Sequence, residues 1–596
     1  MGDYKNLVDL LENRSTLQPD QIAYTFLAGG EQPVLNLTYQ ELAQKARVIA
    51  AEIQAITSLG DRALLVYPYN AGSEFIPALF ACFYAGVVAV PCSAPRRSQE
   101  LNKIIQRFQS SQATVVLSTT EVLNSFKTQL QSQSDLTQLL SQIKWLASDS
   151  VPLVGENTWR RPNIEEETLA YLQYTSGSTG EPKGVMITYA NVLQNCRTIN
   201  QGFRETPASI MLSWLPLFHD MGLVGGVFQP IYVGFRSIIS SPISLIQKPL
   251  RWLEWISEYK ITLSGGPNFA YDLLCSKVTP EQRENLDLSS WAVAFSGAEP
   301  VRAETLEKFA AMFAPCGFRQ EAFYPCYGMA ETTLFVSGGK REAPPVIKYL
   351  DGKALEQDLV VEVERTHPHA KSIVGCGRTW LKDKVIIVNP ETLQQCPEER
   401  IGEIWVQGSG VGKGYWQKPQ ATQATFQAHL ADNPQAGKFL RTGDLGFVSQ
   451  GEIFITGRLK ELIIIWGLNR YPQHLEVTAQ ASHPALRLNC GAAFGIEVEG
   501  EEKLVIAQEI ERTYLRNLPT EEVINAIREA IALEHTLEVY AIALLKPGAL
   551  PKTSSGKVQR RLCKQMYLTG QLKAVTQWQQ EQAEQHDITD LMNQAE

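Results

Sequence analysis

The sequence predicts an α/β protein with a large N-terminal domain and a small α+β C-terminal domain. Residues 1–340 alternate helical patterns with short apolar runs, which is typical of mostly parallel sheets covered by helices. From about Lys384, short strands separated by Gly, Asn and Pro indicate a β-rich subdomain. A separate strand-helix-strand pattern then follows, and 596 residues exceed what one hydrophobic core covers.

Each expected strand of the N-terminal part is followed by a turn and an amphipathic segment. In such α/β patterns, binding sites lie at the C-terminal ends of the strands. The expected strands include Arg62–Tyr67, Ala113–Ser118, Leu169–Tyr174, Ile261–Ser264 and Trp291–Phe295.

The β-rich subdomain, expected over about 375–458, should contain hairpins or a small barrel. Its expected strands are Val385–Val388, Gly402–Gln407 and Gly451–Thr456. The last domain shows strands at Leu504–Ala507 and Val539–Leu545 and a helix at Thr520–Glu534. We expect an N-terminal domain over 1–458, a mobile C-terminal domain over 459–575, and a Gln- and Glu-rich polar tail or linker over 576–596.

Composition excludes several classes of protein. The net charge of −9 argues against a general nucleic-acid binder, and no apolar run reaches the length of a membrane span. The N-terminus lacks the apolar core of a secretory signal. The ten cysteines are scattered without a Cys-x-x-Cys pair, so we expect reduced thiols in a cytoplasmic protein.

The segment Tyr174–Val185 carries the most chemical information. It places Thr, Ser and Gly residues and Lys183 in one loop, a composition that suits a nucleotide's phosphates. Its spacing excludes the common P-loop, because Pro182 occupies the position that the second glycine would take. Taken alone, it remains compatible with a surface turn rich in Ser and Gly.

Six further segments follow in a recognisable order. Together with the loop they resemble the adenylate-forming superfamily, which contains acyl-CoA synthetases, luciferases and nonribosomal adenylation domains. The resemblance covers about residues 20–565 and implies a large domain of sheets sandwiched with helices and a mobile small domain. The segments are Trp214–Leu223, Ser296–Pro300, Tyr327–Thr332, Arg441–Gly446, Gly457–Glu461 and Leu550–Lys557.

The chemistry that this resemblance implies joins a carboxylate to the α-phosphate of ATP. Two anions must meet, so positive charge and in-line positioning are needed. Lys183 and the loop hydroxyls suit the β- and γ-phosphates, and Glu331 suits Mg²⁺, with Thr175 as a second candidate ligand. The residues implied in ATP or AMP binding are Thr175, Ser176, Gly177, Ser178, Thr179, Gly180, Lys183, Ser296, Gly297, Ala298, Tyr327, Gly328, Met329, Ala330, Thr332, Asp444 and Arg458.

Individual roles can be stated for five residues of the motifs. Tyr327 offers a ring for adenine stacking, and Asp444 and Arg458 suit the ribose hydroxyls. By resemblance, Lys557 stabilises the charge that develops between carboxylate and α-phosphate, and His219 lies beside the substrate carboxylate. Each has an ordinary alternative, since a lone His often only packs and Arg441–Asp444 alone would suit an Asx turn.

The branch of the superfamily follows from three details. Phe218–Leu223 looks like the fatty acyl-AMP ligases, and the stretch from Thr332 to Val374 is longer than in CoA ligases. Lys460 stands where many CoA ligases have a hinge aspartate. The resemblance therefore implies a monomer that activates a medium- or long-chain fatty acid with ATP and Mg²⁺ and loads a holo acyl carrier protein.

Two alternatives stay open at this point. The first is a long-chain fatty acyl-CoA synthetase. The second is an inactive adenylate-binding scaffold, which the presence of Lys557, Glu331 and Asp444 disfavours.

Overall fold

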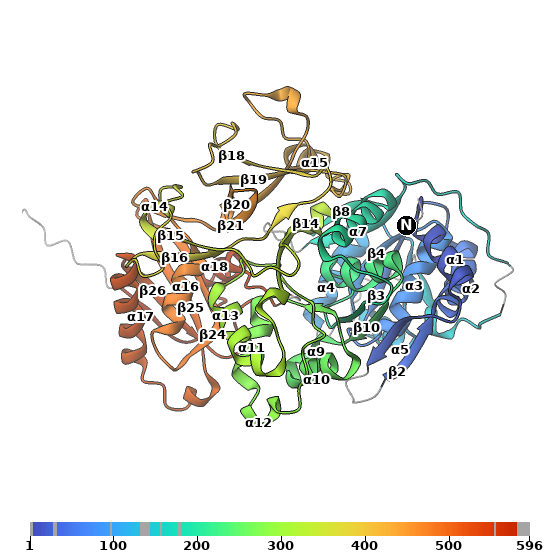
Figure 1. The fold of residues 1–596 in the computed structure, drawn as a ribbon, viewed down its shortest axis with the longest axis horizontal. Coiled ribbons are helices and arrows are strands. Elements are labelled where there is room, and N and C mark those ends of the chain that lie inside the picture. The colour runs from blue at the N-terminus through green and yellow to red at the C-terminus, as the bar shows by residue number, and fades with distance from the viewer. Residues whose placement is uncertain are drawn as a thin grey trace, which may run out of the picture. The chain divides into compact units, whose positions relative to one another are not determined.

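The computed structural model describes residues 4–27, 33–95, 98–131, 143–154, 158–175, 182–553 and 556–580. The chain divides into two compact units, Met1–Thr456 and Gly457–Glu596 (Figure 1). The first unit contains two large sheets, a four-stranded sheet and a two-stranded hairpin, and the second is built on one four-stranded sheet. The α/β class expected from the sequence is confirmed.

The six-stranded sheet of the first unit carries the hairpin that leads into the Ser/Gly loop. Its strand order is β6-β5-β3-β4-β7-β8, parallel except for the β7–β8 pair. The strands are β3 (Arg62–Tyr67), β4 (Val88–Ser93), β5 (Val115–Ser118), β6 (Lys144–Ala147), β7 (Leu169–Thr175) and β8 (Lys183–Thr188).

The nine-stranded sheet has a parallel centre and antiparallel edges. Its order is β17-β14-β13-β12-β11-β9-β10-β1-β2, and β2, β14 and β17 run antiparallel to their neighbours. The strands are β1 (Ile22–Leu27), β2 (Pro33–Thr38), β9 (Ile210–Ser213), β10 (Arg236–Ser240), β11 (Leu263–Gly265), β12 (Val293–Ser296), β13 (Phe323–Gly328), β14 (Phe335–Gly338) and β17 (Arg378–Thr379).

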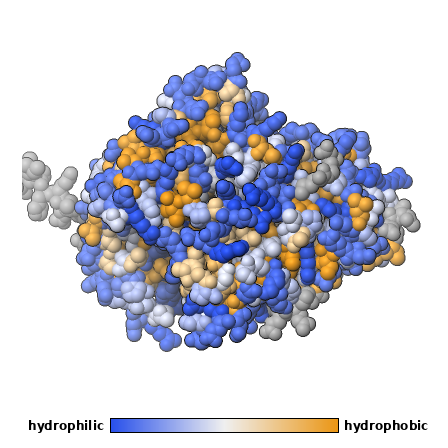
Figure 2. Space-filling view, viewed as in Figure 1, coloured by the Kyte–Doolittle hydropathy of each residue, from blue (hydrophilic) through white to orange (hydrophobic). Residues whose placement is uncertain are grey.

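Helices and these two sheets share one hydrophobic core. Helix α3 (Gly72–Ala85) is apolar around its circumference, as a helix enclosed by other elements should be. The other helices of the unit are α1 (Leu7–Leu17), α2 (Tyr39–Ile56), α4 (Ser98–Ser111), α5 (Thr120–Gln131), α7 (Tyr189–Phe203), α8 (Gln229–Val233), α9 (Pro242–Gln247), α10 (Leu250–Tyr259), α11 (Asn268–Lys277), α12 (Pro280–Arg283), α13 (Ala303–Phe313) and α15 (Pro419–Phe426). The visible surface is mostly hydrophilic with scattered hydrophobic residues (Figure 2).

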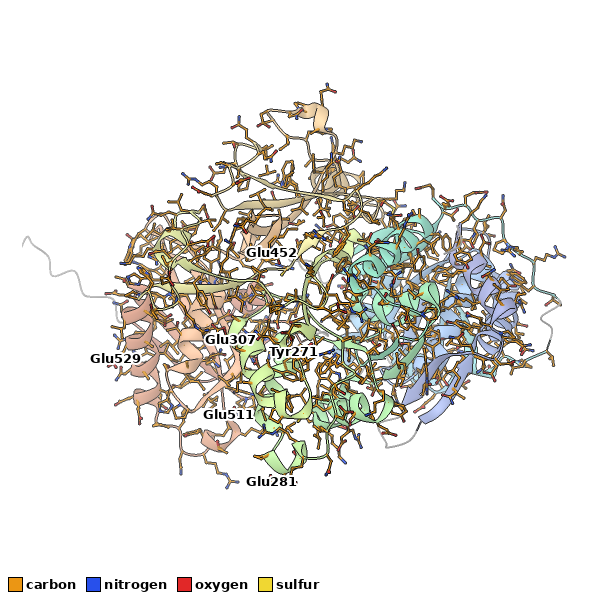
Figure 3. All side chains as sticks on the ribbon, viewed as in Figure 1. Tyr271, Glu281, Glu307, Glu452, Glu511 and Glu529 are labelled. Atoms are coloured by element: carbon orange, nitrogen blue, oxygen red, sulfur yellow. The ribbon has the colours of Figure 1, made fainter. Side chains whose placement is uncertain are left out.

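The long stretch after Thr332 contains a hairpin that packs on helix α13 of the same unit. Strands β15 (Ile347–Asp351) and β16 (Ala370–Val374) pair antiparallel, with α14 (Gly352–Leu355) between them. Ser372 Oγ donates to Glu304 Oε1 of α13 at 2.8 Å, and Arg365 binds Glu307 of α13 (labelled in Figure 3) through two bonds of 3.1 and 2.9 Å. The hairpin is thus anchored to α13 by polar contacts.

A second, β-rich part of the first unit follows the hairpin. It has the strand order β18-β19-β20-β21 and lies within the β-rich stretch expected over about 375–458. Its strands are β18 (Lys384–Val388), β19 (Gly402–Gln407), β20 (Leu440–Ser449) and β21 (Glu452–Arg458).

The second unit covers its sheet with helices on both faces. The sheet order is β24-β25-β26-β27, with a small β22–β23 hairpin beside it. Helices α16 and α17 share one apolar cluster with the sheet and α18 shares another. The elements are β22 (Ile463–Ile465), β23 (Leu468–Arg470), α16 (Pro472–Ala481), β24 (Leu486–Val498), β25 (Glu501–Ile510), α17 (Thr520–His535), β26 (Val539–Leu545), α18 (Arg560–Leu568) and β27 (Ala574–Gln579).

One expectation about the C-terminus is wrong. Residues 576–579, assigned to the polar tail, belong to β27, which pairs antiparallel with β26. A strand in such a sheet needs apolar side chains on only one face. Trp578 provides the apolar contact here: it packs against the α16 and α17 cluster, and the guanidinium of Arg528 in α17 lies 4.4 Å from its ring centroid. Residues 581–596 lie outside the described residues. Among the described residues, no helix is long and apolar enough to cross a membrane.

A buried carboxyl group follows the end of α7. Glu205 is 6 % exposed and accepts a hydrogen bond from the Gln229 amide. Burial raises the pKa of Glu205 to about 8, although the Gln229 amide acts in the opposite direction. The folded state therefore holds this proton at pH values where the unfolded chain has released it.

We predict that Glu205 makes the protein less stable as the pH rises from about 4.5 to 8. The folded state binds more protons than the unfolded state in this window, so stability falls by up to about 1.4 kcal/mol per pH unit. Glu205→Gln should remove this contribution, so that its stability gain over the wild type grows with pH. Urea unfolding at several pH values measures it, with exposed Glu321→Gln as control; parallel curves for wild type and Glu205→Gln would contradict it.

Candidate functional site

The hairpin β7–β8 sets the position of the Ser/Gly loop. Thr175 ends β7, Lys183 begins β8, and the two residues pair across the hairpin. The predicted phosphate-binding residues Ser176, Gly177, Ser178, Thr179 and Gly180 lie outside the described residues. The structure therefore places only the two ends of this loop.

Tyr415 links the two charged residues expected at the phosphates. Its hydroxyl donates to Glu331 Oε1 at 2.8 Å, and Lys183 Nζ lies 5.0 Å from the centroid of the same ring. Tyr415 and Glu331 are buried. Burial and, next, the Glu331 charge raise the pKa of Tyr415, so the phenol stays protonated and remains a donor.

Main-chain bonds hold Tyr415 in this place. Gly412 N donates to Glu331 O at 2.9 Å, while Met186 N donates to Gly414 O and Trp416 N to Gly184 O, both at 2.8 Å. The segment Gly412–Trp416 therefore runs along β8 and also contacts the Glu331 turn. A Cβ at Gly412 would lie 3.0 Å from Met186 O, which favours glycine at this close approach.

Helix α7 supports the Glu331 turn from behind. The Asn195 side-chain amide donates to Thr332 O at 3.2 Å and to Phe335 O at 2.9 Å, and its Oδ1 accepts from Phe335 N at 3.1 Å. These three bonds hold the chain on both sides of Thr333, whose φ of 70° is left-handed. Gly328 before the turn is tightly packed, because a Cβ there would lie 1.8 Å from Leu334 O.

Tyr327 and Asp444 meet at the second part of the site. Tyr327 is the penultimate residue of β13, Asp444 lies in β20, and the Tyr327 hydroxyl donates to Asp444 Oδ2 at 2.7 Å. Both side chains are buried, and Asp444 N donates to Thr442 Oγ1 at 3.1 Å. The residues expected at adenine and ribose are thus in direct contact, although 117 positions separate them.

The turn after β12 lies against β13. A Cβ at Gly297 would be 2.7 Å from Cys326 O, and Ala298 has a left-handed φ of 74°. Ser296 is buried, and its Oγ has no hydrogen-bond partner among the described atoms. Ser296–Ala298 and Tyr327–Thr332 therefore lie at the C-terminal ends of two neighbouring parallel strands. Ligands bind at these strand ends in such sheets.

His219 lies next to the strand that leads into the loop. Gln173 of β7 donates to Phe218 O at 2.9 Å, and the Phe218 and His219 rings lie 4.9 Å apart. Directly after Asp220 the chain forms a π-helix, Met221–Phe228, a form that is uncommon and is often found at functional sites.

Arg458 and Lys557 belong to the second unit, which begins at Gly457, so the last two residues of β21 lie beyond the end of the first unit. Arg458 ends β21, and Lys557 lies in the loop before α18, where its N donates to Thr553 Oγ1 at 3.0 Å. The structure thus brings together Lys183 with Glu331, and Tyr327 with Asp444. Their roles and those of Met329, Ala330 and the other expected residues remain predictions.

Sequence reasoning missed Tyr415 and Asn195. Gly408–Gly414 and the residues after it belong to none of the motif segments that the sequence shows. The available signal was an aromatic pair, Tyr415 and Trp416, directly after a glycine-rich run. Asn195 gave no signal, because a polar residue in an amphipathic helix is usually solvated.

The residues present fit Mg²⁺ bound together with a nucleotide. Among the described residues, no group of three or more His, Cys, Asp or Glu could hold a metal ion. Mg²⁺ is commonly bound by one or two carboxylates together with substrate phosphates and water. A single buried carboxylate, oriented by Tyr415 near a lysine, matches that donor set.

Family models match most of the chain. The model described as AMP-binding enzyme covers residues 11–416, and the model described as Disco-interacting protein 2-like, AMP domain, covers residues 460–577. Enzymes of the AMP-binding family that form adenylates use ATP, so ATP is the expected co-substrate.

Individual proteins match over nearly the full length. The medium-chain-fatty-acid–[acyl-carrier-protein] ligase JamA of Moorena producens is 46% identical over 97% of both chains. The long-chain-fatty-acid–AMP ligase FadD32 of Mycolicibacterium smegmatis is 33% identical over 96% of both chains.

A solved structure also matches nearly the full length of the chain. The fatty acyl-adenylate ligase from L. pneumophila, in complex with acyl adenylate and pyrophosphate, is 38% identical with a TM-score of 0.74, covering 97% of this chain and 98% of that one. By sequence and by structure, the chain belongs to the AMP-binding enzymes, in the branch of the fatty acyl-AMP ligases.

Proposed function

We propose that the protein joins a medium- or long-chain fatty acid to AMP and then transfers the acyl group to the phosphopantetheine thiol of an acyl carrier protein. In the first step a carboxylate oxygen attacks the α-phosphorus of ATP, and the bond to the β-phosphate oxygen breaks, releasing pyrophosphate. In the second, the thiol sulfur attacks the acyl carbon, AMP leaves, and the thiol proton is released.

The contact of Tyr415 with both Lys183 and Glu331 carries this proposal. It places a cation over the ring of Tyr415 and a carboxylate at its hydroxyl. Lys183 would neutralise phosphate oxygens, and Glu331 would be the protein's ligand for Mg²⁺, with Thr175 at the end of β7 as a further candidate. When bound, Mg²⁺ neutralises phosphate charge and aids the departure of pyrophosphate.

The remaining residues position the substrates. Tyr327 would stack on adenine, and the Asp444 carboxylate, held by the Tyr327 hydroxyl, would accept from the ribose. His219 beside β7 would contact the fatty acid's carboxylate. Lys557 would stabilise the charge between carboxylate and α-phosphate, and Arg458 would donate to the ribose.

We predict that Lys557→Ala nearly abolishes acyl-AMP formation while ATP still binds. Its charge matters most in the transition state, and loss of one such group typically costs about 10²–10³ in rate. Pyrophosphate release measures the rate, and calorimetry measures ATP binding, with Lys503→Ala, at a partly exposed position of the same unit, as control. Near-normal adenylation by Lys557→Ala would refute the role.

We predict that Tyr415→Phe raises the Mg²⁺ concentration needed for half-maximal adenylation by about tenfold or more, since losing a group that orients a metal ligand commonly has such an effect. The ring contact with Lys183 is retained, and the fatty acid's carboxylate is assigned to His219. The dependence of the rate on fatty-acid concentration should therefore change little. The control is Tyr24→Phe, which removes another buried hydroxyl, bonded to Val227 O at 2.8 Å. Equal Mg²⁺ dependence in the two variants would contradict the assignment.

The acceptor distinguishes the proposal from an acyl-CoA synthetase. We expect a fatty-acid series with ATP, CoA and a holo carrier protein in one mixture to yield acyl-carrier product and little acyl-CoA. Mass spectrometry of both products measures the ratio. Abundant acyl-CoA would favour the synthetase, and absence of any adenylate, trapped as hydroxamate, would favour a scaffold without turnover.

A further inference from the structure

The end of the second unit has a charge distribution unlike the rest of the chain. Residues 539–580 contain seven Lys or Arg and no Asp or Glu, in a protein whose net charge is −9. This segment comprises β26, the Lys557 loop, α18 and β27. A local positive region in an acidic protein indicates an anionic partner.

The fold places this charge on one side of the sheet. Alternate residues of β26 face opposite clusters, Ile542 and Leu544 toward α16 and α17, Ala541 and Ala543 toward α18. Helix α17 carries exposed Glu521, Glu522, Glu529 and Glu534, with Glu529 labelled in Figure 3. The two helical layers of this unit therefore differ in charge.

Arg560 fixes the orientation of α18 and is not part of its exposed face. It binds Glu476 of α16 through two bonds of 2.6 and 2.7 Å and Glu461 through one of 2.7 Å. Its side chain is 20% exposed. Cys563 of α18 is fully buried and packs with apolar residues of the sheet. These contacts leave the opposite side of α18 directed to solvent.

That solvent side combines positive charge with apolar surface. Arg561, Lys564 and Leu568 recur at helical spacing on one face, and Leu568 is 60% exposed. Arg561 and Lys564 form no ion pair within the part of the chain that the structure describes. We call Arg561, Lys564, Gln565 and Leu568 the α18 face.

The α18 face is tied to the Lys557 loop. Gln559 N donates to Pro551 O and Cys563 N to Gln559 O, both at 2.9 Å, so loop and helix are hydrogen-bonded at their junction. Glu509 Oε1 accepts from Gly548 N at 2.8 Å and Leu550 N at 3.0 Å, which holds the start of the loop. A partner bound to α18 would thus be held close to the loop that carries Lys557.

We propose that the α18 face docks the acyl carrier protein, by pairing Arg561 and Lys564 with carboxylates on the helix that follows the carrier's phosphopantetheine serine and by covering Leu568 with an apolar residue. This inference rests on the proposed function, since it names the surface that receives the acceptor. Charge complementarity would act mainly on the encounter rate and on the choice of partner.

The test uses the full chain with the double substitution Arg561→Glu and Lys564→Glu. The matched control is Arg512→Glu with Arg516→Glu, an equal change of charge at exposed residues beside Tyr514, which packs with the α16 and α17 cluster. The acceptor is a holo acyl carrier protein with an acidic helix after its modified serine. Urea unfolding verifies that both variants fold.

We expect the α18 variant to lower kcat/KM for the carrier by about 10–100-fold, as expected for lost electrostatic steering. Adenylation, trapped as hydroxamate, and transfer to free pantetheine should stay within twofold of wild type. Raising the salt concentration should slow carrier transfer by the wild type and the control more than by the α18 variant. Replacing the carrier's helix carboxylates by amides should reproduce the loss and add little to it in the α18 variant.

Other outcomes separate this inference from the function on which it rests. If the wild type adenylates but loads no holo carrier, the proposed acceptor is wrong. If the wild type loads the carrier and the α18 variant matches the control, only the docking surface is wrong. If carrier transfer is unchanged while co-sedimentation with phosphatidylglycerol vesicles is lost, the face binds a lipid surface and the proposal is overturned.

Discussion

The hydrogen bond from Tyr415 to Glu331 is the contact on which the first unit's site depends. It fixes a buried carboxylate, which would otherwise have several orientations, and the same ring contacts the Lys183 ammonium. A buried charge without such partners would be costly. The bond exists because main-chain hydrogen bonds hold the Gly412–Trp416 segment against β8 and against the Glu331 turn. This pairing sets the distance between the Lys183 ammonium and the Glu331 carboxylate.

The nine-stranded sheet supplies the second half of the arrangement. Its parallel centre brings the turn after β12 and the turn after β13 to one edge, and tight glycine contacts hold both turns in place. The β-rich part then adds Asp444 through its bond with Tyr327. Three separate parts of the chain thus converge on one edge, and each is rigidly supported, as a site that must align two anions requires.

The two faces of the sheet in the second unit are covered by helices that differ in charge and in their connection to the Lys557 loop. Helices α16 and α17 cover one face with an acidic outer layer, while α18 on the other face is joined to the Lys557 loop. Arg560 sits between carboxylates at the base of α18, and these carboxylates raise the pKa of its guanidinium although burial opposes them. The exposed charges of α18 are therefore presented by a helix whose orientation is fixed.

The sequence by itself determined the fold class, most strand positions and the family, because hydrophobic period and short motifs are local properties. Strands β3, β19 and β26 have the predicted bounds, and the helix expected at Thr520–Glu534 ends one residue later. Only the tertiary structure decided which groups meet: Tyr415 and Glu331 are 84 positions apart, and Asn195 reaches Phe335 across 140. It also decided that residues 576–579 form an edge strand, since pairing with β26 and the contact of Trp578 with α17 outweigh their polar composition. Such contacts depend on chain segments folding together, and no local pattern encodes them.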